Sequence, residues 1–185
     1  FPLGETIVTW TATDSSGNVS TDSQIISVID TTLPEITAPT NIQSEASDSI
    51  GNAIDLVGAR TSDLVEITSI TNDAPQIFPL GETIVTWTAT DSSGNVSTDS
   101  QKVLIIDTTV PSITVPNDVQ IEAISINTNI VELGLAEASD LVEVASITND
   151  APEVFPLGET IVTWTATDSS GNSASETQII SVIDT

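Results

Sequence analysis

The chain has 185 residues, and its 27 Asp and Glu residues face only 2 basic ones, which gives a formal net charge of −25. A surface of this charge repels nucleic acid phosphates and anionic lipid head groups, so neither nucleic acid nor a membrane surface is an expected partner. Cys and His are absent, which excludes disulfides, thiolate or imidazole metal sites and the common nucleophile–base pairs of enzymes. We therefore do not expect an enzyme.

Hydrophobic residues make up 38% of the chain and gather in runs rich in Val and Ile, which separates it from acidic disordered chains. No apolar run is long enough to span a bilayer, so direct membrane insertion is not expected. Without disulfides, stability must come from packing or from bound cations. Divalent cations are the most effective at offsetting so large a negative charge.

One sequence period of 77 residues organises the chain. The string FPLGETIVTWTATDSSG occurs three times, beginning at Phe1, Phe78 and Phe155. Shorter strings keep the same spacing: IDT with Asp30, Asp107 and Asp184, SDLVE from Ser62 and Ser139, and ITNDAP from Ile70 and Ile147. Several independent strings at a single period indicate a tandem array of equivalent modules.

The segments IDTTLP (29–34) and IDTTVP (106–111) mark the junctions between modules. Proline cannot donate a ladder hydrogen bond and therefore lies at strand starts or in linkers. We predict two complete modules, at residues 33–109 and 110–185, and only the C-terminal part of another module at residues 1–32. So short a segment cannot bury a sandwich core alone. Either an upstream segment of the natural chain or another chain would complete it, and the first alternative is the simpler.

The first strand pattern of the complete modules lies in residues 53–59. Ile54 and Leu56 point inward there and Asp55 points outward, and residues 130–136 repeat this pattern. Further extended segments are predicted at residues 64–72 and 76–80.

The second half of each module reads as a long hairpin. In residues 82–91, Val85, Trp87 and Ala89 share one face, and this alternation is typical of a half-buried strand. DSSGN (91–95) has the composition of a hairpin turn. A second strand, 96–106, follows. Its positions 103 and 105 are always Val or Ile in the repeats, so that face is predicted to point inward.

About seven short strands per module, with a Trp in the core, predict an all-β chain of tandem immunoglobulin-like (Greek-key) β-sandwich modules with a 77-residue period. The combination of DTT-x-P, ITNDAP, FPLGETIVTWTATDSSGN and IIDTT resembles the hyalin repeat (HYR) family over the whole chain. This resemblance implies an immunoglobulin-like fold, an extracellular location and a role in adhesion or surface structure, without catalysis. The chain departs from many family members in having no Cys. That removes any disulfide contribution and raises the demand for other cross-links.

Calcium is the cofactor that this composition favours, because Ca²⁺ binds carboxylate, amide and carbonyl oxygens. In an immunoglobulin-like sandwich, the incoming linker shares one end of the module with the loop at 61–65 and the turn at 91–95. We predict two metal sites there, one made by Asp30, Asp63, Asp91 and Asn95 and the next by Asp107, Asp140, Asp168 and Asn172. Asp184 would begin a third site. The alternative is that these residues only form turns exposed to water.

Four other polar residues form a second candidate cluster, at the opposite end of each module. Asn72-Asp73 and Asn149-Asp150 either reach the following junction or, as we favour, form a turn. Glu45 and Glu122 lie early in their modules and are candidates for minor ligands.

Two functions follow from this sequence. The first is an extracellular structural or adhesive repeat protein that forms a stiff stalk, filament or surface-layer element, with Ca²⁺ stiffening the module junctions. Its partners would be neighbouring repeats or other copies of the same protein, at the cell surface or in a secreted filament. The alternative is an adhesion module that binds a glycan or protein ligand on a cell surface through its loops, with repetition adding avidity.

Overall fold

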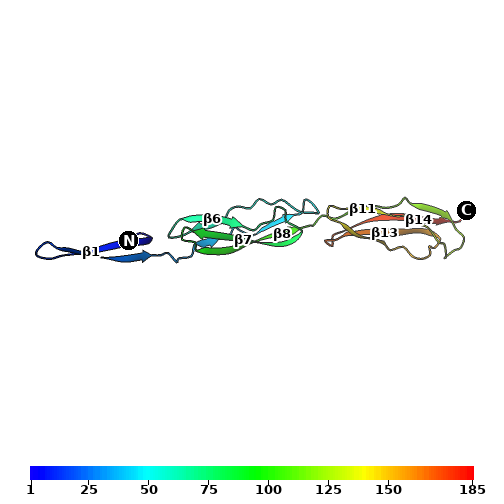
Figure 1. The fold of residues 1–185 in the computed structure, drawn as a ribbon. Helices are drawn as coiled ribbons and strands as arrows, with labels where there is room; N and C mark the ends of the chain where they lie inside the picture. The colour runs from blue at the N-terminus through cyan, green and yellow to red at the C-terminus, as the bar shows by residue number, and fades with distance from the viewer. The chain divides into compact units, whose positions relative to one another are not determined.

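The computed structural model describes residues 1–185 as fourteen β-strands without a helix (Figure 1). The strands form small sheets that are arranged as β-sandwiches, so the prediction of an all-β sandwich chain is confirmed. The structure has no helix with the length and apolar character that crossing a membrane requires.

The first sheet is a two-stranded antiparallel hairpin. It consists of β1 (Gly4–Thr13) and β2 (Val19–Val28), and their register runs from Gly4 opposite Val28 to Thr13 opposite Val19. No further strand pairs with this sheet.

The next two sheets occupy residues 35–106. A short antiparallel pair joins β3 (Glu35–Thr37) to β5 (Arg60–Ser62). The four-stranded sheet has the order β4-β8-β7-β6, made by β4 (Ile42–Glu45), β8 (Val96–Ile106), β7 (Gly81–Asp91) and β6 (Ile67–Asn72). Strand β4 is parallel to β8, and β8 is antiparallel to β7, which pairs with β6. A bridge between Asn52 and Phe78 adds one further pairing.

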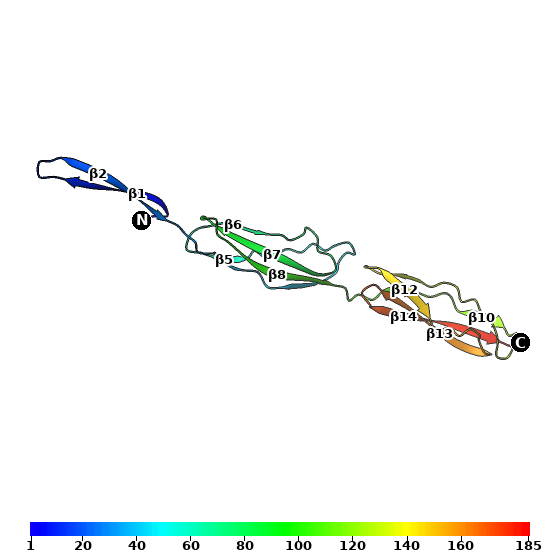
Figure 2. The ribbon, with the colours of Figure 1, turned by 60° about the horizontal axis from the view of Figure 1, so that its bottom comes forward.

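Residues 112–183 repeat this topology. The short pair joins β9 (Ser112–Thr114) to β11 (Glu137–Ser139). The four-stranded sheet has the order β10-β14-β13-β12, made by β10 (Val119–Glu122), β14 (Ser173–Ile183), β13 (Gly158–Asp168) and β12 (Val144–Asn149). Figure 2 shows these strands from a second direction. The repeated sequence thus gives the same strand order twice.

Internal contacts divide the chain into two compact units. The first comprises residues 1–41, 55–75 and 84–102. It holds β1, β2, β3, β5 and β6, most of β7 and the start of β8. The second comprises residues 42–54, 76–83 and 103–185 and holds the remaining strands. The domain boundaries predicted near residues 32 and 109 stay predictions.

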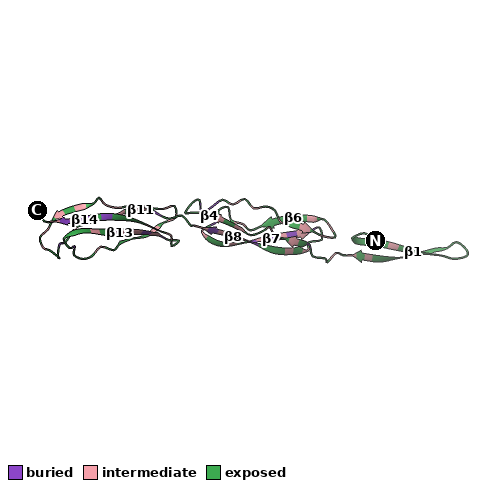
Figure 3. Cartoon of the chain, turned by 180° about the vertical axis from the view of Figure 1, so that it is seen from behind, coloured by how far each residue is buried: buried purple, intermediate pink, exposed green.

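Alternation along the long strands places the core where the sequence predicts it. Val85, Trp87 and Ala89 of β7 are buried, and so are Val103 and Ile105 of β8, while the residues between them are more exposed (Figure 3). Apolar side chains on one face of a strand point the same way, because successive side chains alternate between the two faces.

One expectation about strands needs correction. Residues 53–59 and 130–136 have the predicted facing, with Ile54 and Leu56 half-buried and Asp55 exposed, but they form no ladder hydrogen bonds. Each sandwich therefore has six strands rather than about seven. Hydrophobic alternation reports which side of a segment faces the core, and it does not report whether a neighbouring strand lies within hydrogen-bonding distance.

The core of the C-terminal sandwich is a cluster made by Phe155, Val162, Trp164, Ile180 and Val182. A buried polar side chain, Gln178, completes it: its Oε1 accepts a hydrogen bond from Trp164 Nε1 at 3.1 Å. Gln178 Nε2 in turn donates to the carbonyl oxygens of Asn117 at 2.7 Å and Leu133 at 3.0 Å. The side chain therefore joins β14 to the Trp of β13 and to two segments outside the sheet.

The hairpin β1–β2 repeats the sequence around the Trp of β7 and of β13, but its Trp is not buried. Trp10 is 62% exposed, whereas the equivalent Trp87 and Trp164 are 4% and 6% exposed. Trp10 Nε1 still donates to Gln24 Oε1 at 3.2 Å, so the cross-strand bond forms without a surrounding core. Burial of this Trp is consequently a property of the complete sandwich and not of the hairpin.

The buried Gln gives a prediction about stability. Replacing Gln178 with Leu gives an apolar side chain of similar length and leaves Trp164 Nε1 and the carbonyl oxygens of Asn117 and Leu133 without this partner. We expect the free energy of unfolding to fall by about 3 kcal/mol, measured by urea unfolding followed by circular dichroism. The matched control is Gln24→Leu, which breaks the equivalent but exposed bond and should change stability by less than about 0.5 kcal/mol. Equal effects of the two substitutions would contradict the role of burial.

Candidate metal centre

Two groups of three aspartates converge in the structure. In the first, the carboxylates of Asp30, Asp63 and Asp91 each offer an oxygen, and these oxygens lie within 4.8 Å of one another. In the second, Asp107, Asp140 and Asp168 meet in the same way within the same limit. The structure thus brings together the three Asp residues of each predicted site, and their role as metal ligands stays a prediction.

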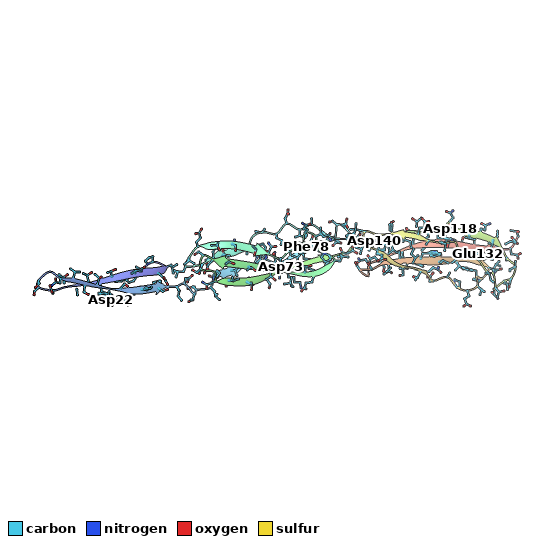
Figure 4. The ribbon with its side chains drawn as sticks, viewed as in Figure 1. Asp22, Asp73, Phe78, Asp118, Glu132 and Asp140 are labelled. Carbon is cyan, nitrogen blue, oxygen red and sulfur yellow. The ribbon has the colours of Figure 1, made fainter.

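Three different elements supply each group. Asp30 follows β2, Asp63 follows β5 in the loop before β6, and Asp91 is the last residue of β7. The second group repeats these places, and Figure 4 labels Asp140, which lies in the loop between β11 and β12. We call residues 30–32 and 107–109 the linkers, because they connect β2 to β3 and β8 to β9. Asp30 and Asp107 are the first residues of the two linkers.

The turn after β7 fixes Asp91 in place. Its Oδ1 accepts hydrogen bonds from the backbone N–H groups of Ser93 at 2.9 Å and Asn95 at 2.8 Å, and its Oδ2 accepts one from Asn95 Nδ2 at 2.8 Å. Gly94 has a φ of 88°, a conformation that a side chain would disfavour. Asp, Gly and Asn are thus each required by the turn geometry.

This turn forms without the other two carboxylates. In the hairpin β1–β2, Asp14 accepts hydrogen bonds from Ser16 N, Asn18 N and Asn18 Nδ2 at 2.9, 2.8 and 2.8 Å. Asp14 is exposed and belongs to neither group of three. The geometry of the turn aspartate is therefore local, and the linker and loop aspartates are added to it.

The Asn of the turn also reaches the linker. Asn95 Nδ2 lies 3.3 Å from the carbonyl oxygen of Asp30 and 3.4 Å from its Oδ2, and Asn172 Nδ2 lies 3.1 and 3.4 Å from the same atoms of Asp107. We predicted that Asn95 and Asn172 give oxygen ligands. In this arrangement their amide nitrogens face the carboxylates, and a metal bond from either amide oxygen requires the amide to turn over. Their role as ligands stays a prediction.

The loop aspartate differs between the two groups. Asp140 Oδ2 accepts a hydrogen bond from the backbone N–H of Val142 at 2.9 Å. In contrast, Asp63 Oδ2 is buried and has no hydrogen-bond partner. A buried carboxylate oxygen without a donor is costly, and two further carboxylates within 4.8 Å add repulsion.

The turn aspartates are ionised at neutral pH. Burial raises the pKa of the Asp91 carboxyl, but the hydrogen bonds from Asn95, Ser93 and Gly94 outweigh burial and hold the pKa below its ordinary value of 3.8. The pKa of Asp168 is lowered for the same reason, with burial opposed chiefly by Asn172. At neutral pH each group therefore has a charged turn aspartate.

The second candidate cluster forms turns, as we favoured. Asp73, labelled in Figure 4, accepts the backbone N–H of Thr86 at 2.7 Å, and Asn72 Oδ1 accepts that of Ala74 at 3.1 Å. Asp150 and Asn149 make the equivalent bonds to Thr163 and Ala151. These acids fasten the end of an edge strand to the long strand beside it.

Glu45 and Glu122 lie outside both groups of three. Their carboxylates bind Thr108 and Thr185 of the segments that follow β8 and β14. Sequence reasoning missed the Thr residues, although the 77-residue repetition of both members of each pair is a signal that points to them.

Comparison with known proteins shows that the chain is similar to hyalin repeats. Residues 106–182 match the HYR domain. The whole chain aligns at 35% identity with hyalin of Lytechinus variegatus, covering 38% of that protein, and at 37% with hyalin of Strongylocentrotus purpuratus, covering 17%. The chain thus spans less than half of either relative. A protocadherin gamma B7 ectodomain aligns with 98% of this chain and with 58% of its own length, at 14% sequence identity and a TM-score of 0.39. This likeness is distant.

The turn geometry predicts a pH effect. A folded pKa below the unfolded value means that the ionised carboxylate stabilises the fold above the unfolded pKa and that this stabilisation is lost as the pH falls through the folded pKa. Replacing Asn172 with Ala removes the main bond that favours the charged form of Asp168. We expect the pKa of Asp168 to rise, because burial still opposes ionisation while the strongest of the hydrogen bonds that favour the charged form is gone. Acid unfolding should then begin at higher pH.

The measurement is an NMR titration of the Asp168 carboxyl carbon in excess chelator. Asn18→Ala is the control, because Asn18 is the main cause of the lowered pKa of Asp14 and that residue is exposed. There the pKa should rise only toward its ordinary value. An Asp168 pKa that stays low in the Asn172→Ala chain would contradict this account of the turn.

Proposed function

This chain is a member of the hyalin repeat (HYR) family, and from that premise we propose that it is a segment of an extracellular structural or adhesive repeat protein whose module junctions are stiffened by Ca²⁺. Each of the two groups of three aspartates would hold one ion. The chain would act by holding successive sandwiches in a fixed relation, so that the protein serves as a stalk, filament or surface-layer element.

The charge of the site supports a cation. Three carboxylates whose oxygens lie within 4.8 Å repel one another strongly unless a positive charge lies between them. The chain supplies only 2 basic residues against 27 acidic ones, so protein side chains offer little compensation. A hard divalent ion with oxygen ligands fits both the charge and the donor atoms, and Ca²⁺ accepts the irregular geometry of loops better than Mg²⁺ does.

The observation that carries the proposal is the oxygen of Asp63. Asp63 Oδ2 is shielded from solvent, has no hydrogen-bond donor and belongs to a group of three carboxylates. Turn formation does not account for it, because both oxygens of the turn aspartate Asp91 have donors: Oδ1 accepts two backbone N–H groups and Oδ2 accepts the Asn95 amide. A bound cation gives this oxygen a partner and removes the repulsion at the same time.

The origin of the ligands supports a mechanical role. Asp30 lies in a linker, whereas Asp63 lies in the loop that follows β5 and Asp91 is the last residue of β7. An ion bound to all three ties the linker to these elements and restricts its backbone. Sites of extracellular modules typically bind Ca²⁺ with dissociation constants of about 10⁻⁴–10⁻³ M, so such a junction would be filled outside a cell and empty inside it.

The first test changes Asp63 to Asn. In excess chelator we expect the melting temperature of the variant to exceed that of the wild type by roughly 4 °C, because the substitution removes a buried charge from an anionic cluster. In millimolar Ca²⁺ the order should reverse, because a ligand that binds the native state stabilises it and the variant has lost one site. Differential scanning calorimetry measures both conditions.

The matched control is Asp55→Asn, which removes the same charge at an exposed position outside both groups. It should leave the calcium response unchanged. If Ca²⁺ stabilises the wild type and the Asp63→Asn chain equally, the first group is not a calcium site. If Ca²⁺ has no effect on any of them, neither group of three binds the ion and the aspartates serve only to form loops and turns.

The second test concerns stiffness. In a chain with both linker aspartates replaced, Asp30→Asn and Asp107→Asn, Ca²⁺ should no longer alter the shape of the particle in solution. Small-angle X-ray scattering of the wild type should show a narrower range of conformations and a larger maximum dimension with Ca²⁺ than with chelator. A wild-type scattering profile that is the same in both conditions would leave calcium without a mechanical role, even if it binds.

A further inference from the structure

We infer that Glu45 is a positioning residue for the cation site at Asp107, Asp140 and Asp168, which it serves by fixing the linker that carries Asp107. The inference rests on the proposed function, since it concerns how one of the proposed sites is assembled. Glu45 belongs to neither group of three aspartates, so it would act on the site without binding the ion.

Glu45 is held next to the start of the linker by the sheet. It is the last residue of β4, it pairs with Ile106 at the end of β8, and the following residue, Ala46, donates its N–H to the carbonyl oxygen of Ile106 at 2.7 Å. Its position therefore follows from the parallel ladder between β4 and β8, and the carboxylate extends from that fixed point.

Three donors of the linker converge on this carboxylate. Glu45 Oε1 accepts the backbone N–H of Thr108 at 2.6 Å, Oε2 accepts the Thr108 hydroxyl at 3.1 Å, and the Thr109 hydroxyl lies 3.5 Å from Oε1. Hydrogen bonds to a charged carboxylate are shorter and stronger than those between neutral groups. We call this set of bonds the linker contact.

The linker contact acts on the residue next to a proposed ligand. Asp107 precedes Thr108, its Oδ1 accepts the N–H of Thr109 at 3.1 Å, and its carbonyl oxygen accepts Asn172 Nδ2 at 3.1 Å. The backbone on the C-terminal side of Asp107 is thereby fixed before any ion binds. Fixing a ligand in advance reduces the conformational entropy lost on binding, and residues that orient metal ligands affect affinity in this way.

The same arrangement recurs one repeat later. Glu122 ends β10 opposite Ile183 and accepts the N–H and the hydroxyl of Thr185, both at 3.0 Å. Asp184 precedes Thr185 as Asp107 precedes Thr108, but Asp184 belongs to no group of three aspartates in this chain. Glu122 therefore provides an internal control: it makes the same contact without a completed site beside it.

The experiment uses the full chain with Asp63→Asn, so that only the second site is left to bind Ca²⁺. Isothermal titration with CaCl₂ gives its dissociation constant. Adding Glu45→Gln should raise that constant about tenfold, as expected for a residue that orients a metal ligand. Thr108→Val, which leaves every charge in place, should raise it by a smaller factor of about three. Glu122→Gln removes the same charge as Glu45→Gln and should leave the constant unchanged.

A second measurement does not depend on calcium. Amide hydrogen exchange of Thr108 in excess chelator should be faster with Glu45→Gln and unchanged with Glu122→Gln. Faster exchange with an unaltered calcium affinity overturns the positioning role. Complete loss of binding with Glu45→Gln overturns it as well, because Glu45 would then be a ligand. If Glu122→Gln weakens calcium binding as much as Glu45→Gln does, the effect is one of net charge, and the positioning role is overturned as well.

Failure of the proposed function has a different signature. If the parent Asp63→Asn chain and the wild type both bind no Ca²⁺ while Thr108 exchange responds to Glu45→Gln, the calcium site is wrong and the positioning role falls with it. The linker contact itself would then stand as a purely structural device.

Discussion

The register of the long hairpin is the constraint on which the rest of the structure depends. Side chains of a strand alternate between two faces, so a slip of one residue between β7 and β8 would expose Val85, Trp87 and Ala89 and bury their polar neighbours. The turn at residues 91–95 prevents this slip, because the Asp91 carboxylate accepts three hydrogen bonds from Ser93 and Asn95. One aspartate thus sets the register of the core strands and supplies a charged group at the end of the sandwich.

This double use of the turn links stability to the proposed site. The turn needs the ionised form of its aspartate, so the carboxylate stays charged even though it is buried. A linker aspartate and a loop aspartate then approach a charge that cannot be removed by protonation at neutral pH. Hydrogen bonds from the turn Asn reduce the resulting repulsion in part. The first group retains a buried oxygen without any donor, and a cation is the natural complement of that oxygen.

Repetition gives this local chemistry a structural meaning. The Asp residues of each group come from a linker, a loop and a turn, and two such groups occur 77 residues apart with the same members. The Glu–Thr contacts at β4 and β10 recur with the same period. Thr108 and Thr109 of the second linker thus have a neighbour that fixes them.

The sequence alone determined the strands with the strongest alternation, the turns and the grouping of the Asp residues. Side-chain alternation and turn chemistry are local, so the residues themselves encode β7, β8 and the turn between them. The 77-residue period then aligned the repeats and indicated which positions tolerate polar residues. The grouping of the Asp residues followed from the topology of an immunoglobulin-like sandwich, which places the linker, one loop and the hairpin turn at one end of the module.

Only the tertiary structure decided the features that depend on distance between segments far apart in the chain. The identical residues around Trp10 and Trp164 differ tenfold in exposure because only one of them lies in a complete sandwich. Residues 53–59 alternate as a strand would without joining a ladder. The amide orientation of Asn95, the unpartnered oxygen of Asp63 and the bonds of Glu45 to the linker likewise depend on atoms that converge from separate segments. Composition and spacing specify which groups meet, and packing sets the direction in which each atom points.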